Sequence, residues 1–263
     1  MENLLQVENL TIATNTGLEL VRNVSFTVQK NEIVVLLGQS GSGKTMTSMA
    51  ILDLLPAGII KTSGTIRLGG EINRTDICGR IASMVMQAPA SCFDPVFTIR
   101  TQLTDILKSH GKEALCTDRH FSKMMADVEL DNPQEILSAY PFQLSGGMLQ
   151  RLMIALTLAL ETPLIIADEP TSDLDLPAQA EILNLLMAID RRNKGILMIT
   201  HDMSVALRMA DRVLVMNEGT IVDSFDIKDI YATHRHHYTQ SLIAANLGLC
   251  DNPWHINLGG AHA

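Results

Sequence analysis

The chain contains the octapeptide Gly38-Gln39-Ser40-Gly41-Ser42-Gly43-Lys44-Thr45, which matches the pattern GxxxxGK[ST]. An apolar run over residues 33–37 precedes it and is typical of a buried strand. A helical pattern follows from Lys44 to Leu55 and ends before Pro56. Strand, glycine-rich turn and helix therefore stand in the order that a phosphate-binding loop requires.

The residues of this loop predict how it would hold a nucleoside triphosphate. Its glycines let backbone N–H groups approach an anion without obstruction, and the helix after it points the positive end of its dipole at the same anion. We expect Lys44 to neutralise β- and γ-phosphate charge and the Thr45 hydroxyl to bind Mg²⁺. A chance glycine-rich turn is the alternative, and it does not explain the flanking strand and helix.

Two adjacent acids, Asp168 and Glu169, follow a second apolar run, Leu164–Ala167. Consecutive strand residues point to opposite sides, so the two carboxylates can have different roles. Asp168 is predicted to hold Mg²⁺, and Glu169 to orient the water that attacks the γ-phosphate. An acidic pair in a turn is weak evidence alone, but ligands of open α/β sheets bind at the carboxyl ends of strands.

Short apolar strands alternate with helical patterns along the chain. Further strands are predicted at Gly64–Leu68, Ile81–Met86, Ile196–Thr200 and Val213–Met216, and an amphipathic helix at Ala178–Ile189. This alternation predicts an α/β fold with a mostly parallel sheet flanked by helices. Residues 88 to about 160 are helical in character instead, with breaks at prolines and a glycine.

Composition excludes several classes of protein. The net charge of −9 argues against a nucleic-acid binder. No apolar run approaches the roughly 20 residues of a membrane-spanning helix, and the N-terminus lacks the pattern of a secretory signal. The four cysteines form no CxxC pair, so neither a disulfide framework nor a zinc or iron–sulfur site is expected.

A further motif resembles the signature sequence of the ATP-binding cassette (ABC) ATPases: Leu144-Ser145-Gly146-Gly147-Met148, followed by Gln150-Arg151. Ser145 as a helix N-cap, with Gly146 and Gly147 behind it, would expose N–H donors at a helix N-terminus. In that family the motif contacts the γ-phosphate of ATP held by the opposite subunit. A small P-loop kinase or a GTPase has no reason to carry it.

Three more elements stand in the order typical of this family. Gln87 resembles the glutamine that senses Mg²⁺ and the membrane partner, Ser172-Asp173-Leu174-Asp175 resembles the D-loop, and His201 resembles the switch histidine at the γ-phosphate. Singly, each has an ordinary interpretation, as a strand cap, solvent-facing charges or a turn histidine. The resemblance implies that Glu169, His201 and Gln87 are catalytic, that Asp173 contacts nucleotide, and that Thr45, Gln87 and Asp168 bind Mg²⁺.

The resemblance implies an organisation and a set of partners. It predicts a RecA-like P-loop fold with an antiparallel N-terminal part, an ATPase domain at 1–230 with an inserted helical subdomain at 88–155, and a C-terminal extension at 231–263. It implies ATP and Mg²⁺ as cofactors. It also implies several partners at the cytoplasmic face of the inner membrane: a second ATPase subunit, a different chain or a second copy, two permeases and, indirectly, an extracytoplasmic solute-binding protein.

Other segments indicate which branch of the ABC ATPases this chain resembles. Residues 93–99 and 237–245 resemble the oligopeptide, dipeptide and nickel importer ATPases, while 140–151 and 54–58 resemble nickel-import ATP-binding subunits of the D type. Nickel is therefore the expected cargo. A di- or oligopeptide importer is the alternative, and a soluble ABC ATPase without a transport role is less favoured, because it usually joins two motor domains or inserts a coiled coil.

The chain departs from the family pattern at several points. No aromatic residue precedes Phe26, so base stacking on an early aromatic is not expected. Met148 replaces the commonest glutamine, and Cys250 alone stands where peptide-importer relatives carry a cysteine run, so no cluster is expected there. The histidines His234, His236 and His237 suit Ni²⁺ chemically, but a polar linker that overlaps the family's C-terminal motif is the favoured interpretation.

Overall fold

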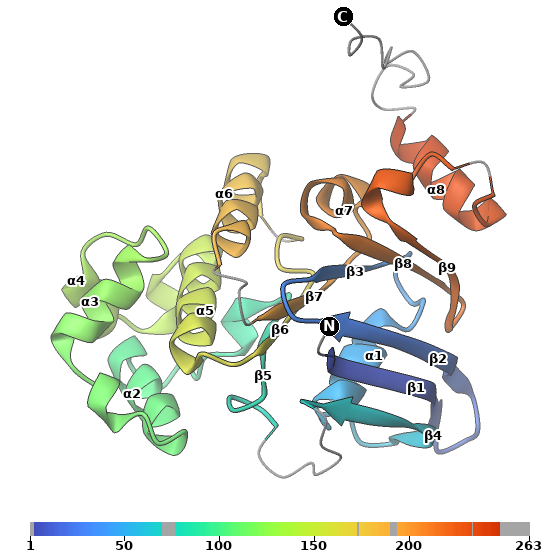
Figure 1. The fold of residues 1–263 in the computed structure, drawn as a ribbon. Helices are drawn as coiled ribbons and strands as arrows, with labels where there is room; N and C mark the ends of the chain where they lie inside the picture. The colour runs from blue at the N-terminus through green and yellow to red at the C-terminus, as the bar shows by residue number, and fades with distance from the viewer. Residues whose placement is uncertain (1–2, 70–76, 173, 190–193, 233, 248–263) are drawn as a thin grey trace, which may run out of the picture.

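The computed structural model describes residues 3–69, 77–172, 174–189, 194–232 and 234–247. The arrangement of these elements is shown in Figure 1. The strands and helices, in chain order, are β1 Asn3–Thr14, β2 Glu19–Gln29, β3 Ile33–Leu37, α1 Lys44–Ile51, β4 Ile59–Leu68, β5 Ala82–Val85, α2 Ile99–Ser109, α3 Asp118–Ala126, α4 Pro133–Ser138, α5 Gly146–Leu160, β6 Leu164–Asp168, α6 Leu176–Met187, β7 Gly195–Thr200, α7 Met203–Met209, β8 Arg212–Asn217, β9 Thr220–Asp226 and α8 His237–Leu247.

The strands form two sheets. Three N-terminal strands make an antiparallel sheet in the order β2-β1-β4. Six strands make the central sheet in the order β5-β6-β7-β3-β8-β9, in which only β9 runs antiparallel to its neighbour. Helices α5, α6 and α7 lie along one side of this sheet, and the antiparallel sheet lies on the other (Figure 1). The predicted fold class is confirmed.

Side-chain alternation divides the interior into two cores. All five residues of β3 are buried. Ile33, Val35 and Leu37 belong to the core shared with the helices, whereas Val34 and Leu36 belong to the core shared with the antiparallel sheet and α1. A strand buried on both faces needs an unbroken apolar sequence, and this explains the run over residues 33–37.

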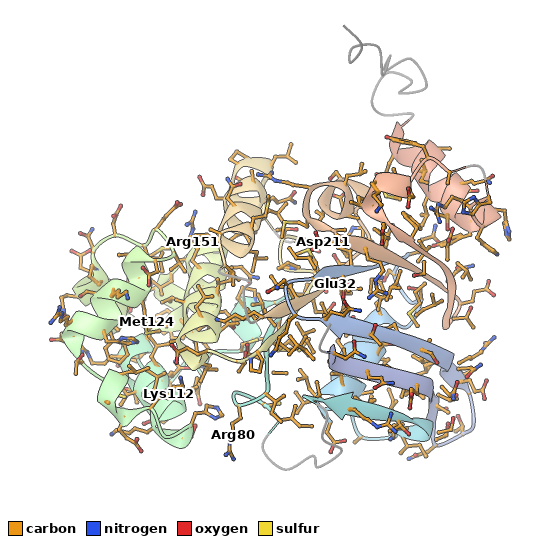
Figure 2. All side chains as sticks on the ribbon, in the orientation of Figure 1. Glu32, Arg80, Lys112, Met124, Arg151 and Asp211 are labelled. Carbon is orange, nitrogen blue, oxygen red and sulfur yellow. The ribbon has the colours of Figure 1, made fainter. Side chains whose placement is uncertain are left out.

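Salt bridges and hydrogen bonds join the two sheets at the start of the central strands. The Asp211 carboxylate accepts the N–H of Ile33 at 2.8 Å. The Arg212 guanidinium donates to Glu32 at 2.8 Å and to the carbonyl of Thr27 at 2.7 Å. Figure 2 labels Glu32 and Asp211 near the middle of the molecule, between the helices and the antiparallel sheet. The beginnings of β3 and β8 are thus fixed to each other and to β2.

Helices α2 to α5 are inserted between β5 and β6 and pack on one another to one side of the sheets (Figure 1). Side chains of Thr98, Thr117 and Ser145 cap the N-termini of α2, α3 and α5. Helix α5 continues to Leu160, so the predicted boundary at residue 155 falls inside it. The division into subdomains stays a prediction.

Two element boundaries differ from the sequence prediction. The helix from Lys44 ends at Ile51 rather than Leu55, because the chain turns through Asp53 at a φ of 61°. Strand β4 begins at Ile59, well before the predicted Gly64, because its first half, whose residues are exposed or half-buried, pairs with β1. Pairing to a neighbouring strand, rather than a regular apolar alternation, forms that part of the strand.

Arg151 on α5 joins the inserted helices to α6 and is labelled in Figure 2. Its guanidinium donates to the carbonyl of Val128 at 2.7 Å, and it pairs with Glu129 and with Glu181. The Arg151 side chain is only 12% exposed, whereas both carboxylates are largely exposed. The carbonyl of a buried residue therefore depends on this one donor group.

We predict that Arg151→Met, which keeps the apolar stem, lowers the free energy of unfolding by about 2 to 3 kcal/mol, because the Val128 carbonyl loses its charged donor. Arg100→Met is the matched control: Arg100 forms an exposed pair with Asp118, so the expected loss is below about 1 kcal/mol. Urea unfolding of both variants measures the difference, and equal losses would contradict the prediction.

Candidate functional site

The glycine-rich loop leaves the end of β3 under close steric restriction. A Cβ at Gly38 would lie 2.2 Å from the carbonyl oxygen of Met216, at the end of β8. Gly43 has a φ of 105°, and a Cβ there would lie 2.8 Å from the carbonyl oxygen of Leu20. Only glycine fits at these two positions, so the strands around the loop determine its path.

Lys44 folds back over the loop. Its ammonium donates to the carbonyls of Gly38 at 2.8 Å and Gln39 at 2.9 Å, and the residue is only 5% exposed. Burial lowers the pKa of Lys44, while the charges of Glu169 and Asp168 act to raise it. The buried cation is thus held by backbone dipoles and by two nearby acids.

Asp168 ends β6 beside the first turn of α1. The Thr45 hydroxyl donates to its carboxylate at 3.4 Å. Burial raises the pKa of Asp168, the hydrogen bond from Thr45 opposes this, and the charge of Glu169 adds to it. A hydroxyl and a carboxylate side by side are oxygen ligands of the kind that Mg²⁺ prefers.

Glu169 has an unusual backbone conformation for a residue other than glycine, with a φ of 47°. Its N–H still donates to the carbonyl of Ile199 on β7 at 2.9 Å. Its two carboxylate oxygens have separate partners: the Ser172 hydroxyl donates to one at 2.7 Å, and the His201 ring nitrogen Nδ1 lies 2.8 Å from the other. The carboxylate is therefore held in one orientation from both sides.

These groups face one open pocket of about 720 Å³ at the carboxyl ends of β3, β6 and β7. The structure brings most of the loop together with Gln87, Glu169 and His201. Gly38, Ser42 and Asp168 are buried and do not line the pocket. The pocket is lined by Leu20, Gln39, Ser40, Gly41, Gly43, Lys44, Thr45, Met46, Gln87, Glu169, His201 and Leu242.

The signature residues lie away from this pocket. Ser145 caps α5 by accepting the N–H of Met148 at 3.2 Å, and it does not line the pocket, nor do Gly146 and Gly147. Ser145 and Gly146 are exposed to solvent. The predicted contact of Asp173 lies outside the described residues.

Three residues of the site had no separate role predicted from the sequence. Ser172 holds Glu169, and Leu20 and Leu242 line the pocket. Ser172 lies within the D-loop match, so its position was a usable signal. Leu20 and Leu242 come from β2 and α8, and no local pattern indicates that either strand or helix reaches the loop.

A glycine-rich loop between a central strand and a helix, with an acidic residue ending a neighbouring strand, defines a P-loop nucleoside triphosphatase. The chain's match to a family model identifies the family of P-loop proteins to which it belongs. The family model described as ABC transporter matches residues 21–172. The chain belongs to the ABC transporter family of ATPases, whose members bind ATP.

Curated relatives match along nearly the whole chain. The nickel import ATP-binding protein NikD of Rhodospirillum rubrum is 43% identical over 249 residues, covering 93% of this chain and 95% of the relative. NikD of Pseudomonas putida is 38% identical over 250 residues, covering 94% and 97%. The predicted resemblance to this branch is confirmed.

Solved structures agree with the fold. The ATP-binding subunit of an ABC transporter superposes with a TM-score of 0.74 at 25% identity, covering 92% of this chain and 99% of that one. CbiO1 from Clostridium perfringens, part of the complex cbiONQ, gives a TM-score of 0.70 at 20% identity, covering 95% and 96%. The second likeness concerns the fold alone.

Two kinds of feature, a membrane-spanning helix and a cluster of metal-ligating side chains, are absent from the described residues. None of the helices in this part of the chain is long and apolar enough to cross a bilayer. Within the same residues, no group of three or more His, Cys, Asp or Glu side chains could hold a metal ion. His236 instead accepts the N–H of Tyr238 at 3.2 Å, which is the role of a helix cap.

We predict that Gly38→Ala weakens ATP binding by about tenfold or more, because the added Cβ would overlap the Met216 carbonyl and displace the loop. Gly111→Ala is the matched control. Gly111, unlike Gly38, has a positive φ, of 69°, but a Cβ there meets nothing within 4 Å and lies outside the pocket. Calorimetric titration with ATP measures both, and unchanged affinity in Gly38→Ala would refute the steric argument.

Proposed function

We propose that this chain is the ATP-hydrolysing subunit of an importer for nickel ion or a nickel chelate. The main support is the 43% identity to a nickel import ATP-binding protein over 93% of the chain. The contact at 2.8 Å between His201 and Glu169 agrees with it. The region aligned with this relative extends beyond residues 21–172, which the family model matches, on both sides.

The residues present fit MgATP. Within the described part of the chain, the hydroxyl of Ser42 is buried without a hydrogen-bond partner, and it lies in the loop that would surround the phosphates. Lys44 is positioned to turn from the loop carbonyls to the β- and γ-phosphates. Thr45 and Asp168, with Gln87, would hold Mg²⁺, which would neutralise charge developing on the transferred phosphoryl group.

Glu169 is the proposed general base. As the oxygen of a water molecule bonds to the γ-phosphorus, the bond to the leaving ADP oxygen breaks and Glu169 accepts the water proton. Ser172 and His201 hold the carboxylate by the contacts at 2.7 and 2.8 Å. His201 is 58% exposed, so its other ring nitrogen is free to reach the γ-phosphate.

The exposed signature residues support a nucleotide sandwich between two ATPase subunits. Ser145, Gly146 and Gly147 present N–H groups at the start of α5 away from their own pocket, so they would serve the ATP of a partner. The partner is a different ATPase chain or a second copy. If it is a different chain, this subunit alone hydrolyses ATP slowly.

Exposed apolar residues support docking to permeases. Val96 and Phe97, shortly after Gln87, are 71% and 49% exposed, and Phe142 is 72% exposed. We propose that two permeases bind near Gln87, that a solute-binding protein acts with them, and that the complex places this chain at the cytoplasmic face of the membrane. A permease contact near Gln87 would link closure of the ATPase pair to transport.

A di- or oligopeptide importer is the second candidate. Residues 93–99 and 237–245 resemble peptide-importer subunits as well, and the ATPase itself does not contact cargo. The inserted helices 88–155 and the extension 231–263 are proposed to have the same roles in either case.

Glu169→Gln is predicted to reduce ATP hydrolysis by about 10²- to 10⁴-fold while ATP binding is retained, because the amide cannot accept the water proton. Glu181→Gln is the control, since that carboxylate is exposed and outside the pocket. Phosphate release and calorimetric binding, measured with the partner subunits present, separate the two effects. A similar loss in both variants would contradict a catalytic role for Glu169.

Cells lacking this gene are predicted to lose uptake of labelled Ni²⁺ and to recover it with the wild-type gene but not with Glu169→Gln. Dipeptide uptake, measured in the same cells, is the parallel control. Lost dipeptide uptake with normal Ni²⁺ uptake would refute the nickel assignment and leave the ATPase role in place.

A further inference from the structure

The pocket has two chemically different walls. The loop and the acids supply its polar wall, where phosphates would bind. Its apolar side chains are Leu20, Met46 and Leu242, and among the described lining residues there is no Phe, Tyr or Trp. A purine base therefore has only aliphatic and methionine side chains to pack on.

Leu242 comes from α8, far along the chain from the loop. One turn earlier on the same helix, the Tyr238 hydroxyl accepts the N–H of Gln39 at 3.3 Å. Tyr238 and Leu242 are four residues apart, so they lie on one face of α8. This face is directed at the loop, and α8 is part of the pocket wall.

The position of α8 is also fixed by packing on the core shared with the helices. Ile243 is buried in this core, at 7% exposed, and the partly buried Tyr238 and Leu242 pack against it. Just before the helix, the Arg235 guanidinium stacks on the ring of Phe225 at 4.0 Å and pairs with Asp223 at 3.3 Å. The Arg235 side chain is 5% exposed, so this anchor on β9 is itself buried.

We propose that α8 forms the base-binding wall of the nucleotide pocket, with the adenine ring packed between Leu242 and Leu20. The hydrogen bond from Gln39 to Tyr238 keeps this wall in contact with the loop. Aliphatic side chains bury both faces of a base by the hydrophobic effect, without stacking on an aromatic ring. The proposal rests on the proposed ATPase function and assigns the part of ATP that α8 recognises.

Calorimetric titration of the full chain with Mg²⁺ present compares two ligands. ATP carries the base, and inorganic tripolyphosphate carries the phosphates alone. Leu242→Ala is expected to weaken ATP binding about fivefold and to leave tripolyphosphate binding unchanged, because the methyl groups removed face the base. Leu242→Val, which removes a single methylene, is expected to weaken ATP binding about twofold. Leu242→Met, which preserves apolar volume, is expected to match wild type.

Two controls separate this proposal from the proposed function. Ser241→Ala alters an exposed residue of α8 outside the pocket and is expected to change neither affinity. Lys44→Ala is expected to abolish binding of both ligands. Wild-type protein that binds neither ligand would refute the ATPase function itself.

The direction in which the Leu242 substitutions change ATP affinity decides the role of α8. Unchanged ATP affinity in Leu242→Ala and Leu242→Val would overturn the proposal. So would tighter ATP binding, which would make α8 a lid that competes with nucleotide. An equal loss for ATP and tripolyphosphate would also overturn it, because α8 would then act on the phosphate loop alone.

Discussion

The central position of β3 in the parallel sheet is the constraint on which the rest of the structure depends. With β7 on one side and β8 on the other, all five of its residues are buried, and the chain can leave only at the carboxyl edge. There it passes so close to the carbonyl of Met216 that residue 38 has no space for a Cβ. The loop, its glycines and the direction of α1 all follow from this restricted exit.

The same edge collects the charged groups. Strand β7 pairs with β3 and β6 pairs with β7, so His201 reaches the loop from the adjacent strand, and Asp168 and Glu169 reach it from the strand beyond. Burial is the leading cause of the lowered pKa of Lys44 and of the raised pKa of Asp168. Asp168 accepts a hydrogen bond from Thr45 and Glu169 contacts His201, and both of these partners are distant in sequence. The site is therefore a product of strand order.

Much of the fold and of the candidate site could be predicted, because the sequence patterns that indicate them are local. The loop, the acidic pair and Ser145 as a cap each combine a residue pattern with the end of one strand or helix, and such patterns survive without tertiary information. Element boundaries that are set by strand pairing or by a turn were misjudged. The first half of β4 exists because it pairs with β1, and the helix from Lys44 stops early because Asp53 adopts a left-handed turn.

The sequence by itself determined the family, the α/β class and the identity of the phosphate-binding loop, because all three depend on short motifs in a fixed order. Tertiary structure alone decided what surrounds those motifs. The contact of His201 with Glu169 and the contact between Gln39 and Tyr238, 199 positions apart, depend on which strands are neighbours and where α8 docks. Such contacts arise from packing between distant segments, and no local pattern of residues records them.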